Sequence, residues 1–170
     1  MNEFASIIIY IMPAILIVAA IYDVSTMKIP NQFSILLIVV YFFAALLFNL
    51  PFSVVVTSTL LALAGLLVGL GMFALNWLGG GDAKLMAATL LWLGVPSLTP
   101  FILYTALAGG GFCLLLMTAR SHLPFFAQTG PGWVMRLMQP KGDIPYGVAI
   151  AIGALLAYPS SPLMTAYIAG

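Results

Sequence analysis

Long runs of apolar residues, separated by short polar links, constrain this chain more than any other feature. The runs occupy residues 5–22, 33–50, 52–78, 85–95, 101–119 and 144–158. A helix that crosses a bilayer needs about 20 apolar residues. Only 5% of the 170 residues are charged, whereas soluble domains carry roughly 25%. The sequence therefore predicts an all-α, polytopic integral membrane protein with about six transmembrane helices, folded as a single domain over residues 1–170.

The fourth run is shorter than the others. At about 1.5 Å per residue, residues 85–95 do not cross a hydrocarbon core about 30 Å thick. We therefore expect the glycine-rich turn before it, residues 79–82, to lie within the leaflet beside water. Glycines suit such a turn, because they permit backbone conformations that other residues avoid. Whether the apolar tail, residues 163–170, re-enters the bilayer is left open by the sequence.

The positive charges predict how the chain is oriented. All five fall in the links after the first, third and fifth runs, at Lys28, Lys84, Arg120, Arg136 and Lys141. Cytoplasmic links of membrane proteins carry an excess of Lys and Arg. These three links are therefore predicted to be cytoplasmic and both termini extracytoplasmic.

Composition also excludes several kinds of partner and cofactor. A net charge of +1 gives no basic surface for nucleic acid, so the lipid bilayer is the surrounding partner that we expect. Cys113 is the only cysteine and His122 the only histidine, so no cluster of metal ligands is expected and no cofactor is predicted. Nothing in the sequence indicates an oligomeric state.

Two aspartates stand at predicted cytoplasmic ends of apolar runs. Asp23 closes the first run, and Asp82 follows the glycines that lead into the fourth. An ionisable side chain in or beside hydrocarbon is costly and usually has a function. Two carboxylates that share a site share one proton. Such a pair can activate water: the ionised member takes a proton from water, while the protonated member hydrogen-bonds the scissile carbonyl.

Each aspartate also has a purely structural interpretation. Asp82 can be the N-cap of the following helix, since Asp is a favoured cap residue. Asp23 can be a solvated residue at a helix end. The third carboxylate on this side, Asp143, lies in a Lys-Gly-Asp sequence that is typical of a solvated loop.

Two other functions remain open at this point. A small ion-coupled transporter could use the two aspartates to carry a proton or cation, although transport sites tend to lie near the midplane between repeats. A noncatalytic scaffold of a pilus or secretion machine would need neither carboxylate. Serine or cysteine hydrolysis is disfavoured, because there is no Gly-x-Ser-x-Gly elbow and neither Cys113 nor His122 has an evident partner.

Two motifs resemble those of a known family. Gly79-Gly80-Gly81-Asp82 matches the GxGD signature of intramembrane aspartyl proteases, and Ala83-Lys84-Leu85 continues it as in prepilin peptidases. Asp23, followed by Lys28-Ile29-Pro30-Asn31, resembles the first catalytic aspartate of that family. Ile144-Pro145-Tyr146-Gly147 resembles the start of its last helix. GxGD alone is a weak motif, but two aspartate motifs in this order are specific.

The resemblance implies a function and a set of site residues. It implies an endopeptidase of the cell inner (cytoplasmic) membrane that removes a short, usually basic leader just before the hydrophobic helix of a prepilin or pseudopilin. Asp23 and Asp82 would be the catalytic pair. The link between the first two runs is too short for the zinc-binding, methyltransferase-linked insertion of larger members, so the chain resembles the compact type that serves tight-adherence (Tad, Flp-type) pili. Residues that would position the substrate are Gly79, Gly81, Lys84, Lys28, Pro30, Asn31, Pro145 and Tyr146.

Overall fold

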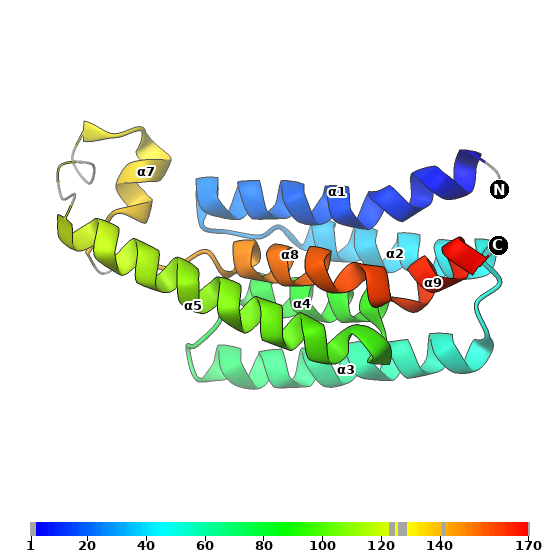
Figure 1. Cartoon of the computed structure of the whole chain (residues 1–170). Helices are drawn as coiled ribbons and strands as arrows, with labels where there is room; N and C mark the ends of the chain where they lie inside the picture. The colour runs from blue at the N-terminus through cyan, green and yellow to red at the C-terminus, as the bar shows by residue number, and fades with distance from the viewer. Residues whose placement is uncertain (1–2, 123–124, 126–128, 141, 170) are drawn as a thin grey trace.

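The protein is a bundle of helices, seen in a computed structural model that describes residues 3–122, 125, 129–140 and 142–169. No strand occurs among these residues, so the all-α prediction is confirmed. α1 begins and α9 ends at the same end of the bundle (Figure 1). Lys141, counted above among the positive charges, lies outside the described residues. The helices are α1 (Glu3–Thr26), α2 (Asn31–Leu47), α3 (Phe52–Ala74), α4 (Gly80–Leu93), α5 (Leu98–His122), α7 (Gly132–Leu137), α8 (Tyr146–Ala157) and α9 (Pro162–Ala169), with short 3-10 turns η1 (Val95–Ser97) and η2 (Tyr158–Ser160).

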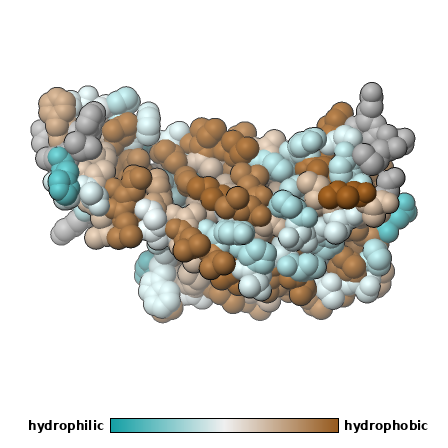
Figure 2. Space-filling model, viewed as in Figure 1, coloured by the Kyte–Doolittle hydropathy of each residue, from teal (hydrophilic) through white to brown (hydrophobic). Residues whose placement is uncertain are grey.

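Four helical segments in the described part of the chain are long and apolar enough to cross a membrane: Ser6–Thr26, Phe52–Ala74, Val95–His122 and Tyr146–Ala169. Their outer faces are hydrophobic; Leu67 on α3 and Leu114 on α5, for example, are more than two-thirds exposed. The visible face of the molecule carries broad hydrophobic areas (Figure 2). The protein is therefore a multi-pass membrane protein, while the count of six spans stays a prediction.

α4 is the centre of the bundle. It has 14 residues, about 21 Å at 1.5 Å per residue, and packs against α2, α3 and α8. Nearly every side chain from Leu85 to Leu93 is buried. Trp92 is fully buried, and its indole Nε1 donates a hydrogen bond to the Leu37 carbonyl of α2 (2.9 Å). A short helix at this position can carry a polar first turn into the bundle because α2, α3 and α8 surround it.

Small residues allow α3 and α4 to pack closely. A Cβ added at Gly69 would lie 2.9 Å from the Cβ of Ala83, and one at Gly65 would overlap the side chain of Leu90. This agrees with the four-residue spacing of these glycines, which favours close approach of membrane helices. The contact fixes α4 against α3 one residue after Asp82.

α3 ends four residues before the predicted end of its apolar run. Asn76 adopts a left-handed conformation (φ 57°), and its N–H donates to the Phe73 carbonyl. The N–H of Trp77 donates to the Met72 carbonyl, which completes a Schellman ending. Asn tolerates this conformation better than most residues. Trp77 and Leu78 therefore leave the helix and are free to line a cavity.

The boundary between α4 and α5 also differs from the predicted one. α4 ends at Leu93, because Gly94 adopts φ 61° and a Cβ there would lie 2.9 Å from Pro162 Cγ. Val95–Ser97 forms η1, so α5 begins at Leu98, three residues before its predicted start.

α8 and α9 follow one another along α1. The tail does not turn back: α9 follows α8 through η2, Leu163 is buried, and the hydroxyls of Tyr167 and Ser6 lie 3.0 Å apart. At the other end, α7 is held to α1 by Arg136, whose Nη2 donates to the Ser25 carbonyl (2.6 Å). Arg120 on α5 donates to the carbonyls of Leu137 and Asp143.

Candidate active site

Asp23 lies on the inward face of α1. The apolar residues of that face recur every three or four positions, as expected for one buried stripe of a helix. They are Ile8, Ile9, Met12, Ile15, Leu16 and Ala19. Asp23 takes the next position of this stripe and is 4% exposed, and α1 continues past it to Thr26. The interpretation as a solvated residue at a helix end is therefore wrong, because the carboxyl replaces a core side chain.

Asp82 lies in the first turn of α4, but it is not the N-cap. Gly79 holds that position, and its N–H donates back to Asp82 Oδ2 (3.2 Å), as the third-position carboxylate does in a capping box. The N-cap prediction is therefore wrong by three residues. Asp82 Oδ1 is buried and receives no hydrogen bond from the described residues. One oxygen of Asp82 thus accepts a hydrogen bond from the start of its own helix, and the other has no hydrogen-bond partner in the described part of the chain.

Two helix N-termini point towards the aspartates. Asp82 is in the first turn of α4, and Asp23 Oδ2 accepts the N–H of Gly147 at the start of α8 (2.8 Å). The first N–H groups of a helix have no partner within the helix and carry partial positive charge, so they bind carboxylates well. Gly147 was not among the predicted site residues. The sequence feature that could have indicated it is Pro145, two residues earlier, because proline is common where a helix begins.

Gly79 and Gly81 are needed for space and not for unusual backbone angles. Gly79 has an ordinary extended conformation (φ −71°, ψ 147°), and Gly80 and Gly81 are helical, so the predicted non-helical turn is wrong. A Cβ at Gly81 would lie 2.8 Å from the Ile29 carbonyl oxygen. α4 therefore begins against the link between α1 and α2, which brings Asp82 to the end of α1.

Asp23 and Asp82 line the same two cavities. The larger, about 350 Å³, extends past Trp77 and Leu78 of the α3–α4 connection to Asp143 and the start of α8. The smaller, about 320 Å³, lies between the α1–α2 link and residues 79–81. Asp143 is exposed and contributes a third carboxylate to the larger cavity. No three His, Cys, Asp or Glu side chains among the described residues are grouped as a metal site requires.

The structure gathers some of the predicted positioning residues at these cavities and places others elsewhere. Gly79 lines both cavities. Gly81 and Lys28 line the smaller cavity, and Pro145 and Tyr146 line the larger. Pro30 is the N-cap of α2.

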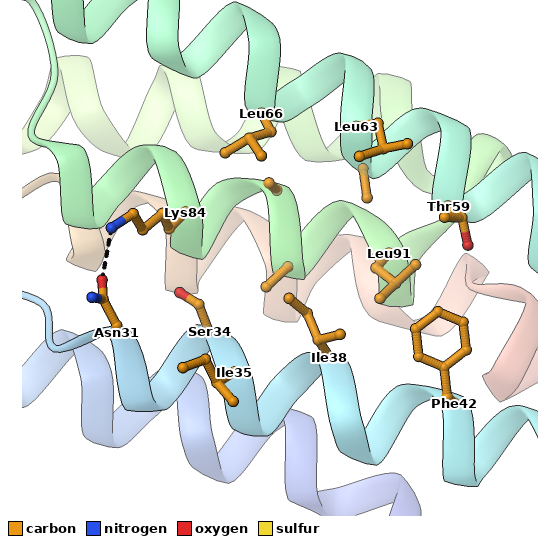
Figure 3. A pocket seen from close by; sticks show the side chains of 13 residues that line it. Asn31, Ser34, Ile35, Ile38, Phe42, Thr59, Leu63, Leu66, Lys84 and Leu91 are labelled. Atoms are coloured by element: carbon orange, nitrogen blue, oxygen red, sulfur yellow. Dashed lines mark hydrogen bonds between the residues drawn. The ribbon is translucent and has the colours of Figure 1, made fainter.

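Lys84 and Asn31 lie in a separate groove. Lys84 Nζ donates to Asn31 Oδ1 (2.9 Å), and the pair closes one end of an apolar groove of about 430 Å³ between α2, α3 and α4 (Figure 3). Ile35, Ile38 and Leu63 line this groove further along. Among the residues that the structure describes, none that lines this groove also lines either aspartate cavity.

The surroundings of Asp82 favour its protonated form. Burial, together with the negative charge of Asp23, raises the pKa of the Asp82 carboxyl to about 7, while the hydrogen bond from the Gly79 N–H opposes the rise. Asp82 precedes the buried part of α4 and lies outside the four candidate spans. A carboxyl with a pKa near 7 can hold or release a proton at neutral pH, as a general acid or base must.

Comparison with known proteins identifies the family. The sequence pattern of the type IV leader peptidase family matches residues 10–114. The chain belongs to the type IV leader peptidase family. The matched region contains both aspartates, α2–α4 and most of α5. No curated protein and no solved structure matches the chain.

Membership of the type IV leader peptidase family makes this protein a peptidase, and therefore a hydrolase, embedded in a membrane by several helices. It favours peptide hydrolysis over the transporter and scaffold alternatives. The match ends before α8, so the parts that α8 contributes, Gly147 and Tyr146, lie outside the matched region.

Proposed function

We propose that the protein is an aspartic endopeptidase that removes the leader of prepilin-like subunits, with Asp23 and Asp82 as the catalytic pair. The observation that carries this proposal is the convergence of both carboxylates on shared cavities at one end of the bundle. Asp23 is oriented by the Gly147 N–H, and Asp82 has a raised pKa and an oxygen that no described residue hydrogen-bonds.

In the proposed reaction, protonated Asp82 donates a hydrogen bond to the carbonyl oxygen of the scissile peptide. Ionised Asp23 takes a proton from water, and the resulting hydroxide attacks the carbonyl carbon. The tetrahedral intermediate then collapses. The C–N bond breaks, Asp23 returns its proton to the leaving amine, and the leader departs with a new carboxyl group.

We further propose that cleavage occurs on the cytoplasmic side of the inner membrane. Lys28 follows α1, Lys84 lies in the first turns of α4, and Arg120 is in the last turn of α5, all at the end of the bundle that carries the aspartates. Arg136 reaches the same end through its bond to Ser25. Positive charge marks the cytoplasmic side of membrane proteins.

The substrate class that we propose is the Flp-type subunit of tight-adherence pili. Only four residues, 27–30, separate α1 from α2, which leaves no room there for a zinc-binding insertion. We also propose that residues 1–170 act as one domain, since α8 and α9 pack along α1 and α4.

Coexpression with candidate prepilins tests the function, with leader removal measured by mass spectrometry. Asp23→Asn and Asp82→Asn should each lower cleavage by about 100-fold or more, the lower range for loss of a general acid or base. Glu3→Gln is the matched control: it makes the same change of carboxylate to amide at the opposite end of α1. Normal processing by either aspartate variant, with the protein inserted in the membrane, would reject the proposal.

A further inference from the structure

A second apolar groove lies between the end of α3 and the middle of α5. Its volume is about 500 Å³, and Met86 of α4 and Ile150 of α8 also line it. α3 packs mainly on α4, and α5 packs mainly on α8, and residues of all four helices line the groove, so it lies between these two pairs. Both flanking helices are candidate membrane spans, so the groove opens towards lipid.

This groove adjoins the larger aspartate cavity, with which it shares lining residues. Trp77, Leu78 and Tyr146 line both of them. A chain that occupies the groove can therefore extend past these three residues to Asp23 and Asp82. The groove between α2, α3 and α4, which carries Lys84 and Asn31, shares no lining residue with either aspartate cavity.

The α5 side of the groove leaves room for a helix. Ala106, Gly109, Gly110 and Cys113 line it at positions i, i+3, i+4 and i+7, so they share one face of α5. A Cβ added at Gly110 would meet no atom within 4 Å. Small side chains allow a second membrane helix to approach closely.

We infer that this groove binds the hydrophobic segment that follows the scissile bond of the membrane-bound substrate. The inference rests on the proposed function. The arrangement of polar and apolar surface also supports it. The cavity lined by three carboxylates, Asp23, Asp82 and Asp143, lies next to the apolar groove. A substrate with a basic leader before a hydrophobic helix has the same order, so the leader meets the carboxylates when the helix lies in the groove.

The single cysteine of the chain allows a direct test, because Cys113 lines the groove. The probe is a prepilin-like subunit that wild-type protein processes in the mass assay, with one cysteine placed at successive positions of its hydrophobic segment. Asp23→Asn protein keeps this probe uncut, and a short bismaleimide joins nearby thiols. We expect cross-links from Cys113 to positions three or four residues apart in the first turns after the cleavage site.

A matched variant moves the thiol to the other groove. Cys113→Ala with Thr59→Cys places the only cysteine among the residues that line the Lys84 groove, and we expect no cross-link from it. Cross-linking from Thr59→Cys but not from Cys113, or from neither, would overturn the inference while leaving the proposed function in place. Failure of wild-type protein to process any prepilin-like subunit would overturn both.

Filling the groove gives an independent test. Gly110→Trp should lower kcat/KM for the membrane-bound substrate by about tenfold or more, because the scissile bond would be displaced from the aspartates. Gly111→Trp is the control: Gly111 is also in α5 and also has no atom within 4 Å of an added Cβ, but it does not line the groove. Thermal unfolding of both variants tests whether each of them folds. Equal kcat/KM for the two folded variants would refute the inference.

Discussion

Replacing Gly147 with alanine tests whether the orientation of Asp23 controls catalysis. The added Cβ would lie 2.8 Å from Asp23 Oδ2 and 2.9 Å from Ile29 Cδ1, whereas ordinary van der Waals contact begins at 3.4 Å. The carboxylate and α8 must therefore separate by about 0.6 Å, the difference between 3.4 and 2.8 Å. The hydrogen bond from the Gly147 N–H, now 2.8 Å long, would lengthen or bend.

The expected result is a loss of activity with a modest loss of stability. A misplacement of 1 Å can cost about 100-fold in rate, so a shift of about 0.6 Å should lower kcat/KM by about tenfold. Strain from the extra methyl group should cost about 1–3 kcal/mol, and the higher helix propensity of alanine should offset up to about 1 kcal/mol of that. The measurements are leader removal at several substrate concentrations and thermal unfolding of the same samples in detergent.

Gly111→Ala is the control for this prediction. It makes the same substitution in α5, where nothing lies within 4 Å of the new Cβ, so cleavage and unfolding temperature should stay close to wild type. If Gly147→Ala processes the substrate at the wild-type rate, then Asp23 does not depend on its bond to the start of α8, and the reasoning fails.

Four further predictions rest on the same structure. Burial raises the pKa of Asp82 to about 7, and its protonated form is the proposed donor, so kcat/KM should fall above about pH 7; a profile that stays flat to about pH 9 would contradict this. Because this pKa lies above the ordinary value of 3.8, the folded state loses stability as pH rises from 3.8 to about 7. Asp82→Asn removes this loss, so it should raise the unfolding temperature more at about pH 8 than at about pH 5. Gly69→Ala should lower the free energy of unfolding by about 1–3 kcal/mol and reduce activity, because its Cβ meets Ala83 beside Asp82, whereas Gly71→Ala, with open space, should do neither. Trp92→Phe should cost about 1–3 kcal/mol without changing the pH profile, since it removes the buried bond to the Leu37 carbonyl; equal stability would show that this bond contributes nothing.

Several local signals in the sequence predicted the architecture well, and others were missed. The apolar runs predicted α1–α5 and α8, because a membrane segment needs a long apolar stretch wherever it lies in the fold. The ends of α3 and α4 were placed too late. Asn76 and Gly94 carried the signals for those ends, since both residues tolerate left-handed backbone, but the apolar residues that follow them obscured the boundaries.

What the sequence determined by itself is the membrane class, the two aspartate motifs and the family, since these depend on composition and on order along the chain. What only the tertiary structure decided is which groups surround each carboxylate. α8 enters beside α1 from 124 residues away and supplies the Gly147 N–H to Asp23, and α4 is brought against the α1–α2 link by the absence of a side chain at Gly81. Lys84 lies only two residues from Asp82 but faces a different groove, because neighbouring positions on a helix point in different directions. The packing of α1, α4 and α8 therefore decided which residues form the site, and distance along the chain did not.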